Sequence, residues 1–352
     1  MKAASIELEA VSKRYGDVVA VRDVSFTMKA GTLTTLLGPS GCGKTTTLRL
    51  IAGLELPTSG IVRIGDRDVS RIPAAERDVS MVFQSYALFP HMSVLENVRY
   101  GLDVSGASRK AADERARATL ELVGLEGFDV RLPSELSGGQ QQRVAVARAL
   151  VLKPSVLLFD EPLSNLDARL RRQMRDEIRE LQQRLALTVV YVTHDQAEAM
   201  AVSDCIVVMD RGAIAQAGTP RELYEAPRDA FVAGFMGDAN RVRAHLVRKD
   251  ATVGVVDLGG LEVVLPHRGL TGDVLVSIRP EAIRVVDRGA SPLRGTIRKA
   301  AYLGNIMEYT IATPIGELFV VASEVDQPQS EGAEVALSLT GHGVVVIAAD
   351  AR

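Results

Sequence analysis

Residues 38–45 read GPSGCGKT, and this stretch decides the fold class. It fits the pattern G-x-x-x-x-G-K-[ST] and lies between a short apolar run, LTTLL at 33–37, and a helix-like segment at 43–52. Glycines let the backbone wrap an anion with its N–H groups pointing inward, and the N-terminus of the following helix adds a favourable dipole. The stretch is therefore predicted to be a phosphate-binding loop between a strand and a helix.

Two side chains of this loop have expected roles. Lys44 is expected to place its ammonium on the β- and γ-phosphates of a nucleotide, and Thr45 to offer its hydroxyl to Mg²⁺. A glycine-rich turn with an incidental lysine is the alternative, which the flanking strand and helix disfavour. No catalytic role is expected for Cys42, because no thiol-activating base stands beside it in the sequence.

The chain is expected to contain two domains with different patterns. Short apolar runs at 156–159, 188–192 and 206–209 are typical of strands buried on both faces of a parallel sheet, and helical stretches between them predict an α/β fold. From about residue 241 the pattern changes to alternating strands and glycine turns, which predicts an all-β domain of one or two small barrels, with a hairpin turn at 314–316. The expected domains are 1–238, with a helical subdomain at about 86–155, and 239–352.

Two acidic residues, Asp160 and Glu161, directly follow the apolar run VLLF. Ligands gather at the carboxyl ends of strands in an open α/β sheet. Asp160 is therefore expected to bind Mg²⁺, and Glu161 to orient or deprotonate an attacking water. Taken alone, the pair could also be two solvated acids at a strand end.

The composition excludes several classes of protein. The 352 residues carry a net charge of −3 and no basic block, which disfavours a nucleic-acid partner. With two cysteines, a disulfide framework is not expected. No run of 18 apolar residues occurs and the N-terminus does not resemble a signal peptide, so we expect a soluble chain that docks onto a membrane partner if it acts at a membrane.

Residues 136–140 read LSGGQ and precede an amphipathic helical stretch. Ser137 and the two glycines offer a hydroxyl and free N–H groups at a helix N-terminus, which predicts a second anion site. A capped helix start is the alternative, but capping does not by itself account for two adjacent glycines.

In this order, GPSGCGKTT, LSGGQ and VLLFDE resemble an ATP-binding-cassette (ABC) ATPase. The resemblance covers residues 5–235 and implies further roles. Tyr15 matches the aromatic residue that stacks on adenine, Gln84 the glutamine that senses the γ-phosphate and Mg²⁺, and His194 the histidine that contacts the γ-phosphate. Residues 164–167 (SNLD) match the loop that crosses the dimer interface.

The resemblance implies ATP and Mg²⁺ as ligands, bound by two chains paired head to tail. The implied catalytic residues are Glu161, His194 and Gln84, and the implied metal ligands are Thr45, Gln84 and Asp160. The implied nucleotide contacts are Tyr15, Gly38, Pro39, Ser40, Gly41, Cys42, Gly43, Lys44, Thr45, Thr46, Ser137, Gly138, Gly139, Gln140 and Asp167.

The C-terminal part resembles the barrel-like (TOBE) domain of importers of the maltose, polyamine, ferric-iron and aminophosphonate kind, most clearly at 277–285 (SIRPEAIRV). This implies an ATPase subunit on the cytoplasmic face of the membrane, with two transmembrane permease subunits and, indirectly, a solute-binding protein. Residues 86–102 resemble the groove that receives a permease helix, although Tyr86, Leu88 and Phe89 could equally be core residues. Polyamine, iron and aminophosphonate are preferred over sugar as cargo. An exporter subunit and a soluble ABC ATPase of translation or DNA maintenance are the alternatives.

Overall fold

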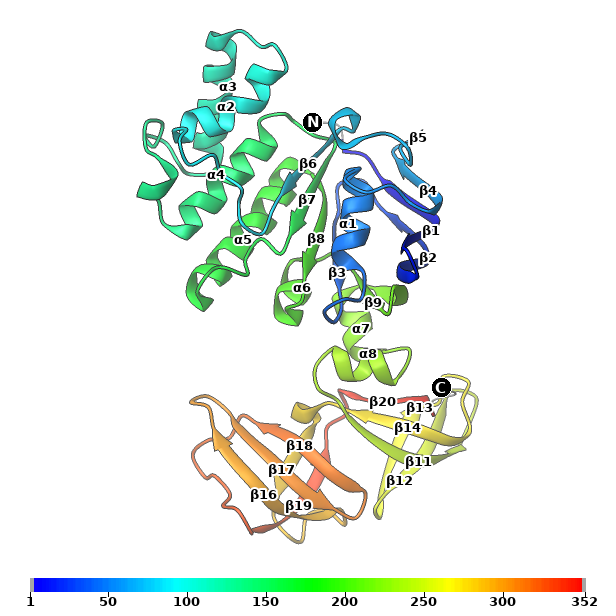
Figure 1. The fold of residues 1–352 in the computed structure, drawn as a ribbon. Coiled ribbons are helices and arrows are strands. Elements are labelled where there is room, and N and C mark those ends of the chain that lie inside the picture. The colour runs from blue at the N-terminus through cyan, green and yellow to red at the C-terminus, as the bar shows by residue number, and fades with distance from the viewer. Residues whose placement is uncertain (1–2, 350–352) are drawn as a thin grey trace. The chain divides into compact units, whose positions relative to one another are not determined.

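A computed structural model describes residues 3–349 of the chain. Its packing divides the chain into two compact units, Met1–Pro220 and Arg221–Arg352 (Figure 1). Each unit has its own hydrophobic core.

The first unit is built on a six-stranded sheet with the strand order β10-β9-β3-β8-β7-β6. The strands from β9 to β6 run parallel, and β10 pairs antiparallel with β9 at the edge. The apolar runs found in the sequence are central strands of this sheet, as predicted. The strands are β3 (Leu33–Leu37), β6 (Val79–Val82), β7 (Val156–Asp160), β8 (Thr188–Thr193), β9 (Cys205–Asp210) and β10 (Ala213–Gly218).

Alternate residues of the central strands point into two different cores, which is why their sequences are continuously apolar. Leu158 and Val190 join the core that contains helix α1 (Lys44–Ala52). Their neighbours Leu157 and Val189 join a core on the opposite face of the sheet. Two helices, α4 (Gly138–Leu150) and α5 (Ala168–Leu185), contribute to that second core.

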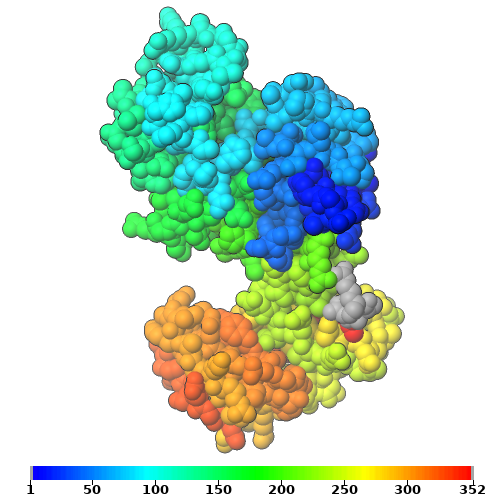
Figure 2. All heavy atoms as spheres, viewed as in Figure 1, coloured from blue at the N-terminus to red at the C-terminus, as the bar shows by residue number. Residues whose placement is uncertain are grey.

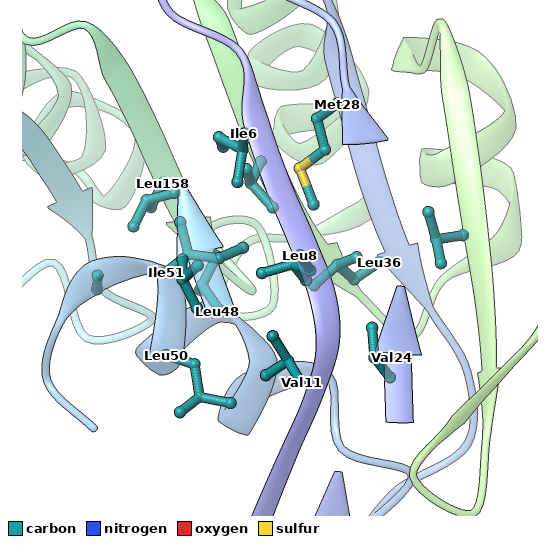
Figure 3. Close-up of a cluster of buried hydrophobic side chains, with 14 of the residues drawn as sticks. Ile6, Leu8, Val11, Val24, Met28, Leu36, Leu48, Leu50, Ile51 and Leu158 are labelled. Carbon is teal, nitrogen blue, oxygen red and sulfur yellow. The ribbon is translucent and has the colours of Figure 1, made fainter. Parts of the chain in front are cut away.

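An antiparallel sheet, which the sequence-based prediction lacks, packs on the α1 side. Its Ile6 and Leu8 lie against Leu48 and Ile51 of α1 and against Leu158 of the parallel sheet (Figure 3). Its strands are β1 (Ile6–Tyr15), β2 (Val18–Met28), β4 (Ser59–Ile64) and β5 (Arg67–Asp68), in the order β2-β1-β4-β5. One core therefore joins this sheet, α1 and the parallel sheet.

Helices follow β6 and form a smaller cluster with its own apolar centre. They are α2 (Val94–Val104), α3 (Arg109–Leu122), the short 3₁₀ turn η2 (Pro133–Glu135) and α4. Helix α2 begins at a capping box in which Ser93 and Glu96 each accept a hydrogen bond from the other's backbone N–H. Side chains of α2 and α3, coloured cyan, form part of the outer surface of the first unit (Figure 2). Two further elements of this unit are η1 (Ala74–Glu76) and α6 (Gln196–Val202).

The second unit contains two five-stranded antiparallel sheets that share one core, so the predicted all-β character is confirmed. One sheet has the order β13-β12-β11-β14-β20 and the other β15-β19-β16-β17-β18. The hairpin predicted at 314–316 joins β17 to β18, with Thr313 opposite Gly316.

The elements of the second unit are α7 (Pro220–Glu225), α8 (Ala230–Phe235), β11 (Asn240–Arg248), β12 (Val253–Leu258), β13 (Leu261–Pro266), β14 (Gly272–Ile278), η3 (Pro280–Ala282), β15 (Ile283–Val286), β16 (Arg294–Tyr302), β17 (Met307–Thr313), β18 (Gly316–Ala322), β19 (Glu334–Leu339) and β20 (Val344–Ala348).

A buried arginine ties helices α7 and α8 to the β-structure of the second unit. The side chain of Arg279 is 1% exposed, and its guanidinium donates to the carbonyl oxygens of Tyr224 (2.6 Å), Ala233 (2.9 Å) and Met236 (2.8 Å). It also lies 4.0 Å from the centre of the Tyr224 ring. Burial lowers the pKa of Arg279 to about 10, so the side chain is still charged at neutral pH.

The contacts of Arg279 explain why residues 221–238 pack with the second unit. The sequence-based boundary assigns them to the first domain, ending at 238, whereas their packing assigns them to the second unit. The change in sequence pattern near residue 241 marks where the strands of the second unit begin. The hydrogen bonds of Arg279 attach the helices that precede those strands to the same unit.

Replacing Arg279 with methionine should destabilise the second unit, because three carbonyl groups lose their donors and a buried polar group without a partner costs about 1–3 kcal/mol. We expect a loss of about 3 kcal/mol in the free energy of unfolding of the full chain, measured by urea denaturation. The matched control is Arg284→Met at an exposed position of β15. Equal stability of the two variants would contradict this role for Arg279.

Candidate functional site

Three neighbouring strands end level with one another at one edge of the parallel sheet. Leu37 at the end of β3 pairs with Thr193 of β8, and Asp160 at the end of β7 pairs with Val192 of β8. The residues that follow these strands are Gly38 of the phosphate loop, Glu161 and His194. The sheet register therefore places in one row the three segments that the sequence analysis selected separately.

The phosphate loop leads into α1 through Gly43. Its backbone φ is 103°, a value that residues with a side chain rarely adopt. A Cβ atom there would lie 2.5 Å from the carbonyl oxygen of Ala20 on β2. Gly43 is the N-cap of α1 and provides no side-chain hydrogen bond to the helix. The first N–H groups of α1 are therefore available to an anion, as the sequence predicts.

Lys44 is buried in the loop, and its ammonium donates to the carbonyl oxygens of Gly38 (2.7 Å) and Pro39 (2.9 Å). The sulfur of Cys42 lies 3.9 Å from the same ammonium. Burial raises the pKa of the Cys42 thiol and outweighs the opposing effect of the Lys44 charge, so the thiol is held neutral. A neutral thiol is a poor nucleophile.

Asp160 and Thr45 meet across the site, with the Thr45 hydroxyl donating to the Asp160 carboxylate at 3.4 Å. Burial is the main cause of the raised pKa of Asp160, and the neighbouring charge of Glu161 acts in the same direction. Two acidic groups and a hydroxyl at the mouth of a phosphate loop form an oxygen-rich site that suits a hard cation.

Glu161 occupies a strained backbone conformation, with a φ of 46°. Its N–H donates to the carbonyl of Val192 on the adjacent strand (3.0 Å), and its own carbonyl accepts from the Ser164 hydroxyl (3.0 Å). These bonds aim the carboxylate at the end of β8, where it lies 3.1 Å from Nδ1 of His194. The structure thus brings together two residues that lie 33 positions apart in the sequence.

The LSGGQ segment forms the N-terminus of α4. Ser137 is the N-cap, in a capping box with Gln140. The adjacent glycines also have a packing role that the sequence analysis missed, because a Cβ at Gly139 would lie 2.9 Å from Leu170 and one at Gly138 would lie 3.1 Å from Leu166. Close packing on the segment after β7 therefore accounts for part of the double glycine within a single chain.

Comparisons with known proteins agree with this geometry. Residues 21–164 match the family model described as ABC transporter, and residues 276–347 match that of the TOBE domain. The Fe(3+) ions import ATP-binding protein FbpC of Agrobacterium fabrum is 55% identical over 348 residues, which cover 99% of each chain. The protein of the same name from Escherichia coli is 48% identical over 344 residues, which cover 97% of each chain.

The chain belongs to the ABC transporter family. A solved dimeric structure, a post-hydrolysis state of the ATP-binding cassette MJ0796 bound to ADP and Pi, is 32% identical with a TM-score of 0.55, and the match covers 61% of this chain and 99% of that one. The predicted fold class and family are confirmed. ABC membership establishes that the chain binds ATP and couples ATP hydrolysis to transport.

Residues 84–87 form the glutamine loop of this ABC chain, and side chains from two other segments bond to its backbone. The carbonyl of Gln84, just after β6, accepts from Nδ2 of Asn165 at 2.9 Å. Tyr86 and Ala87 both have positive φ values, 61° and 48°, and their carbonyls accept from the guanidinium of Arg148 on α4 at 2.9 and 2.7 Å. The sequence analysis placed Asn165 in the SNLD segment but predicted neither its bond to Gln84 nor those of Arg148, since both side chains act on backbone atoms of a distant segment.

Of the three residues considered as contacts for a permease helix, Tyr86 is buried in the core beside α4 and α5, so it is a core residue here. Leu88 and Phe89 are half-buried and therefore still present some surface. The ring of Phe89 lies 4.7 Å from that of Tyr100.

The remaining predicted residues take different positions. Asp167 is the N-cap of α5, with its carboxylate accepting from the N–H groups of Arg169 and Leu170 at 3.0 Å each. Tyr15 lies at the end of β1, in the hairpin with β2. Ser40 and Gly41 belong to the exposed part of the phosphate loop, and Thr46 lies in the first turn of α1.

A buried polar network behind His194 was also missed. Glu198 is buried and accepts from the hydroxyls of Thr193 (2.8 Å) and Tyr191 (3.3 Å), and burial raises the pKa of its carboxyl group. Arg171 of α5 lies 3.8 Å from Glu198 and donates to the carbonyl of Leu166 at 3.1 Å. The network therefore connects the strand that carries His194 to the loop before α5.

Replacing Lys44 with alanine should remove the cation that is expected to face the phosphates of ATP. We expect kcat/KM for ATP hydrolysis to fall by about 10²–10³-fold, because a charge aimed at developing negative charge stabilises the transition state by several kcal/mol. The measurement is steady-state ATPase activity, with unfolding followed separately to confirm an intact fold. Lys29→Ala at an exposed position is the control. Turnover at the wild-type rate in Lys44→Ala would contradict this role for Lys44.

Proposed function

We propose that the chain is the ATP-hydrolysing subunit of an importer and that its cargo is ferric iron. The observation that carries the proposal is similarity over the whole chain, including the C-terminal unit, to proteins named for Fe(3+) import in Agrobacterium fabrum and Escherichia coli. The resemblance of the C-terminal unit to importer domains leaves polyamine, iron and aminophosphonate as candidate cargoes. The names of these relatives favour iron among the three.

The proposed hydrolytic step uses groups at the ends of β7 and β8. The Glu161 carboxylate accepts a proton from the attacking water, or orients it, and His194 holds that carboxylate from 3.1 Å and contacts the γ-phosphate. Lys44 compensates the charge on the β- and γ-phosphates. The strained backbone of Glu161 fits this role, since strain of this kind is concentrated at functional sites.

The residues also fit Mg²⁺. Among the described residues, no group of three His, Cys, Asp or Glu side chains forms a metal cluster, which is compatible with an ion held largely by the nucleotide's phosphates. Thr45, Asp160 and Gln84 would supply the protein's oxygen ligands. When bound, the ion would neutralise charge on the phosphates.

A second copy of the chain completes the proposed site. The hydroxyl of Ser137 and the N–H groups around Gly138 and Gly139 would face the γ-phosphate held by the partner's phosphate loop. The loop before α5, which Asp167 caps, would lie at the interface between the copies. The similarity to a dimeric ATP-binding cassette supports pairing of two copies, for which we propose a head-to-tail arrangement.

Two permease subunits are the proposed membrane partners, with a solute-binding protein acting indirectly from the other side. No described helix meets the length and hydropathy that a membrane-crossing helix needs. Binding to the permease subunits at the cytoplasmic face would use the surface near Leu88 and Phe89. Arg148 and Asn165 would transmit movement of that surface to Gln84, because they bond to the same loop.

The proposal is tested by uptake of radioactive ⁵⁵Fe(III) in cells that lack the gene for this chain. Cells complemented with the wild-type gene should accumulate iron, and cells complemented with Glu161→Gln should not, although this variant should still bind ATP and accumulate closed dimers. Putrescine and aminophosphonate uptake are measured in the same strains and should not change.

Other outcomes would contradict specific parts of the proposal. Loss of putrescine or aminophosphonate uptake with normal iron uptake would show that iron is not the cargo, whereas the importer role would stand. Higher cellular iron in the deletion strain would indicate export. Normal uptake of all three substrates, together with purification of the chain with ribosomes or DNA, would overturn the transport role.

A further inference from the structure

The hairpin of β1 and β2 lies beside the phosphate loop. Ala20 on β2 is so close to Gly43 that its carbonyl oxygen would lie 2.5 Å from a Cβ at that glycine. Tyr15 pairs with Val18, two residues or about 7 Å before Ala20 along the strand. The backbone of Tyr15 is therefore separated from the phosphate loop by a distance that the sugar and phosphates of a nucleotide can span.

A lysine covers one face of this ring. The ammonium of Lys13 lies 4.9 Å from the centre of the Tyr15 ring, within the range of a cation–π interaction. Tyr15 itself is 44% exposed, so part of its ring is accessible to a ligand. Among residues 3–349, no other aromatic ring packs against Tyr15.

The position of Lys13 is fixed by two further partners. Its ammonium forms an ion pair with Glu55 at 2.8 Å and donates to the carbonyl oxygen of Leu56 at 2.9 Å. The side chain of Lys13 is only 14% exposed, which is low for a lysine. Glu55 and Leu56 lie in the loop after α1, so the pair links the hairpin to the helix that begins at the phosphate loop.

Glu55 acts on Tyr15 as well as on Lys13. Burial raises the pKa of the Tyr15 hydroxyl, and the nearby Glu55 carboxylate raises it further. The pKa of Glu55 is lowered, chiefly by its hydrogen bond with Lys13. The three side chains thus form one group, in which the cation faces the ring and the carboxylate faces the hydroxyl.

We propose that Lys13 and Glu55 are positioning residues for the base of ATP, holding the Tyr15 ring in place and making its free face a better stacking surface. This inference rests on the role proposed for Tyr15. A cation on one face of an aromatic ring draws electron density toward itself, and the opposite face becomes more complementary to an electron-rich purine. A fixed ring also loses less conformational entropy when the base binds.

An ion pair that only joins the hairpin to the α1 loop is the competing explanation, and the two differ in what they predict for ligands. Base stacking involves ATP but not inorganic tripolyphosphate, which has the phosphates and lacks the base. If Lys13 acts through base stacking, replacing it therefore changes the binding of ATP alone. A purely structural role changes the phosphate loop as well, and so alters the binding of both ligands.

The test is Lys13→Met, which keeps the length of the side chain and removes its charge. We expect KM for ATP to rise about 5- to 20-fold, a part of what stacking of a base on an aromatic ring contributes to binding, with kcat changed by less than about twofold. The inhibition constant of tripolyphosphate should not change. Lys13→Arg should restore most of the affinity, because a guanidinium also binds aromatic faces, and Glu55→Gln should raise KM in the same direction. Lys110→Met, at an exposed position of α3, is the control.

Tyr15→Ala separates failure of this inference from failure of its premise. If Tyr15→Ala raises KM for ATP and Lys13→Met does not, Tyr15 binds the base without help from Lys13, and the inference is wrong. If neither variant changes KM, Tyr15 does not contact the base at all. If Lys13→Met weakens the binding of ATP and of tripolyphosphate equally, the ion pair is structural and the inference is also wrong.

Discussion

The register of three parallel strands is the constraint on which the site depends. Because β3, β7 and β8 end level with one another, the phosphate loop, Glu161 and His194 emerge side by side. Both faces of these strands are buried in separate cores, so a shift of one residue would exchange the two sets of apolar side chains. The packing that stabilises the sheet therefore also aligns the groups that we propose hydrolyse ATP.

Arginines that bond to backbone carbonyls rather than to acids are a second recurring feature, and two of them, Arg77 and Arg279, are buried. Arg148 holds the glutamine loop, and Arg279 holds the ends of α7 and α8. Arg77 donates to the carbonyls of Leu50 and Ile51 near the end of α1. A guanidinium can satisfy several carbonyls at once, which suits it to irregular segments where helices end.

The sequence predicted the parts of this molecule that depend on local pattern. Continuous apolar runs identified the central strands, and glycine spacing identified the phosphate loop. The antiparallel sheet was not predicted, although Ile6 and Leu8 alternate with acidic residues as its inner face requires. The contacts of Arg148, Asn165 and Lys13 could not be predicted, because each joins segments far apart in the sequence and bonds to backbone atoms, which leave no mark on the partner's sequence.

We propose that strand register makes Glu161 and His194 act as one unit, and a double-mutant cycle tests this most directly. Single-turnover ATP hydrolysis would be measured for the wild type, Glu161→Gln, His194→Ala and the double variant, each at saturating ATP. The account predicts that the double variant is no more than about twofold slower than the slower single variant, because residues acting as a unit are strongly non-additive. A rate reduced by the product of the two single effects would contradict it and would mean that the two side chains contribute independently.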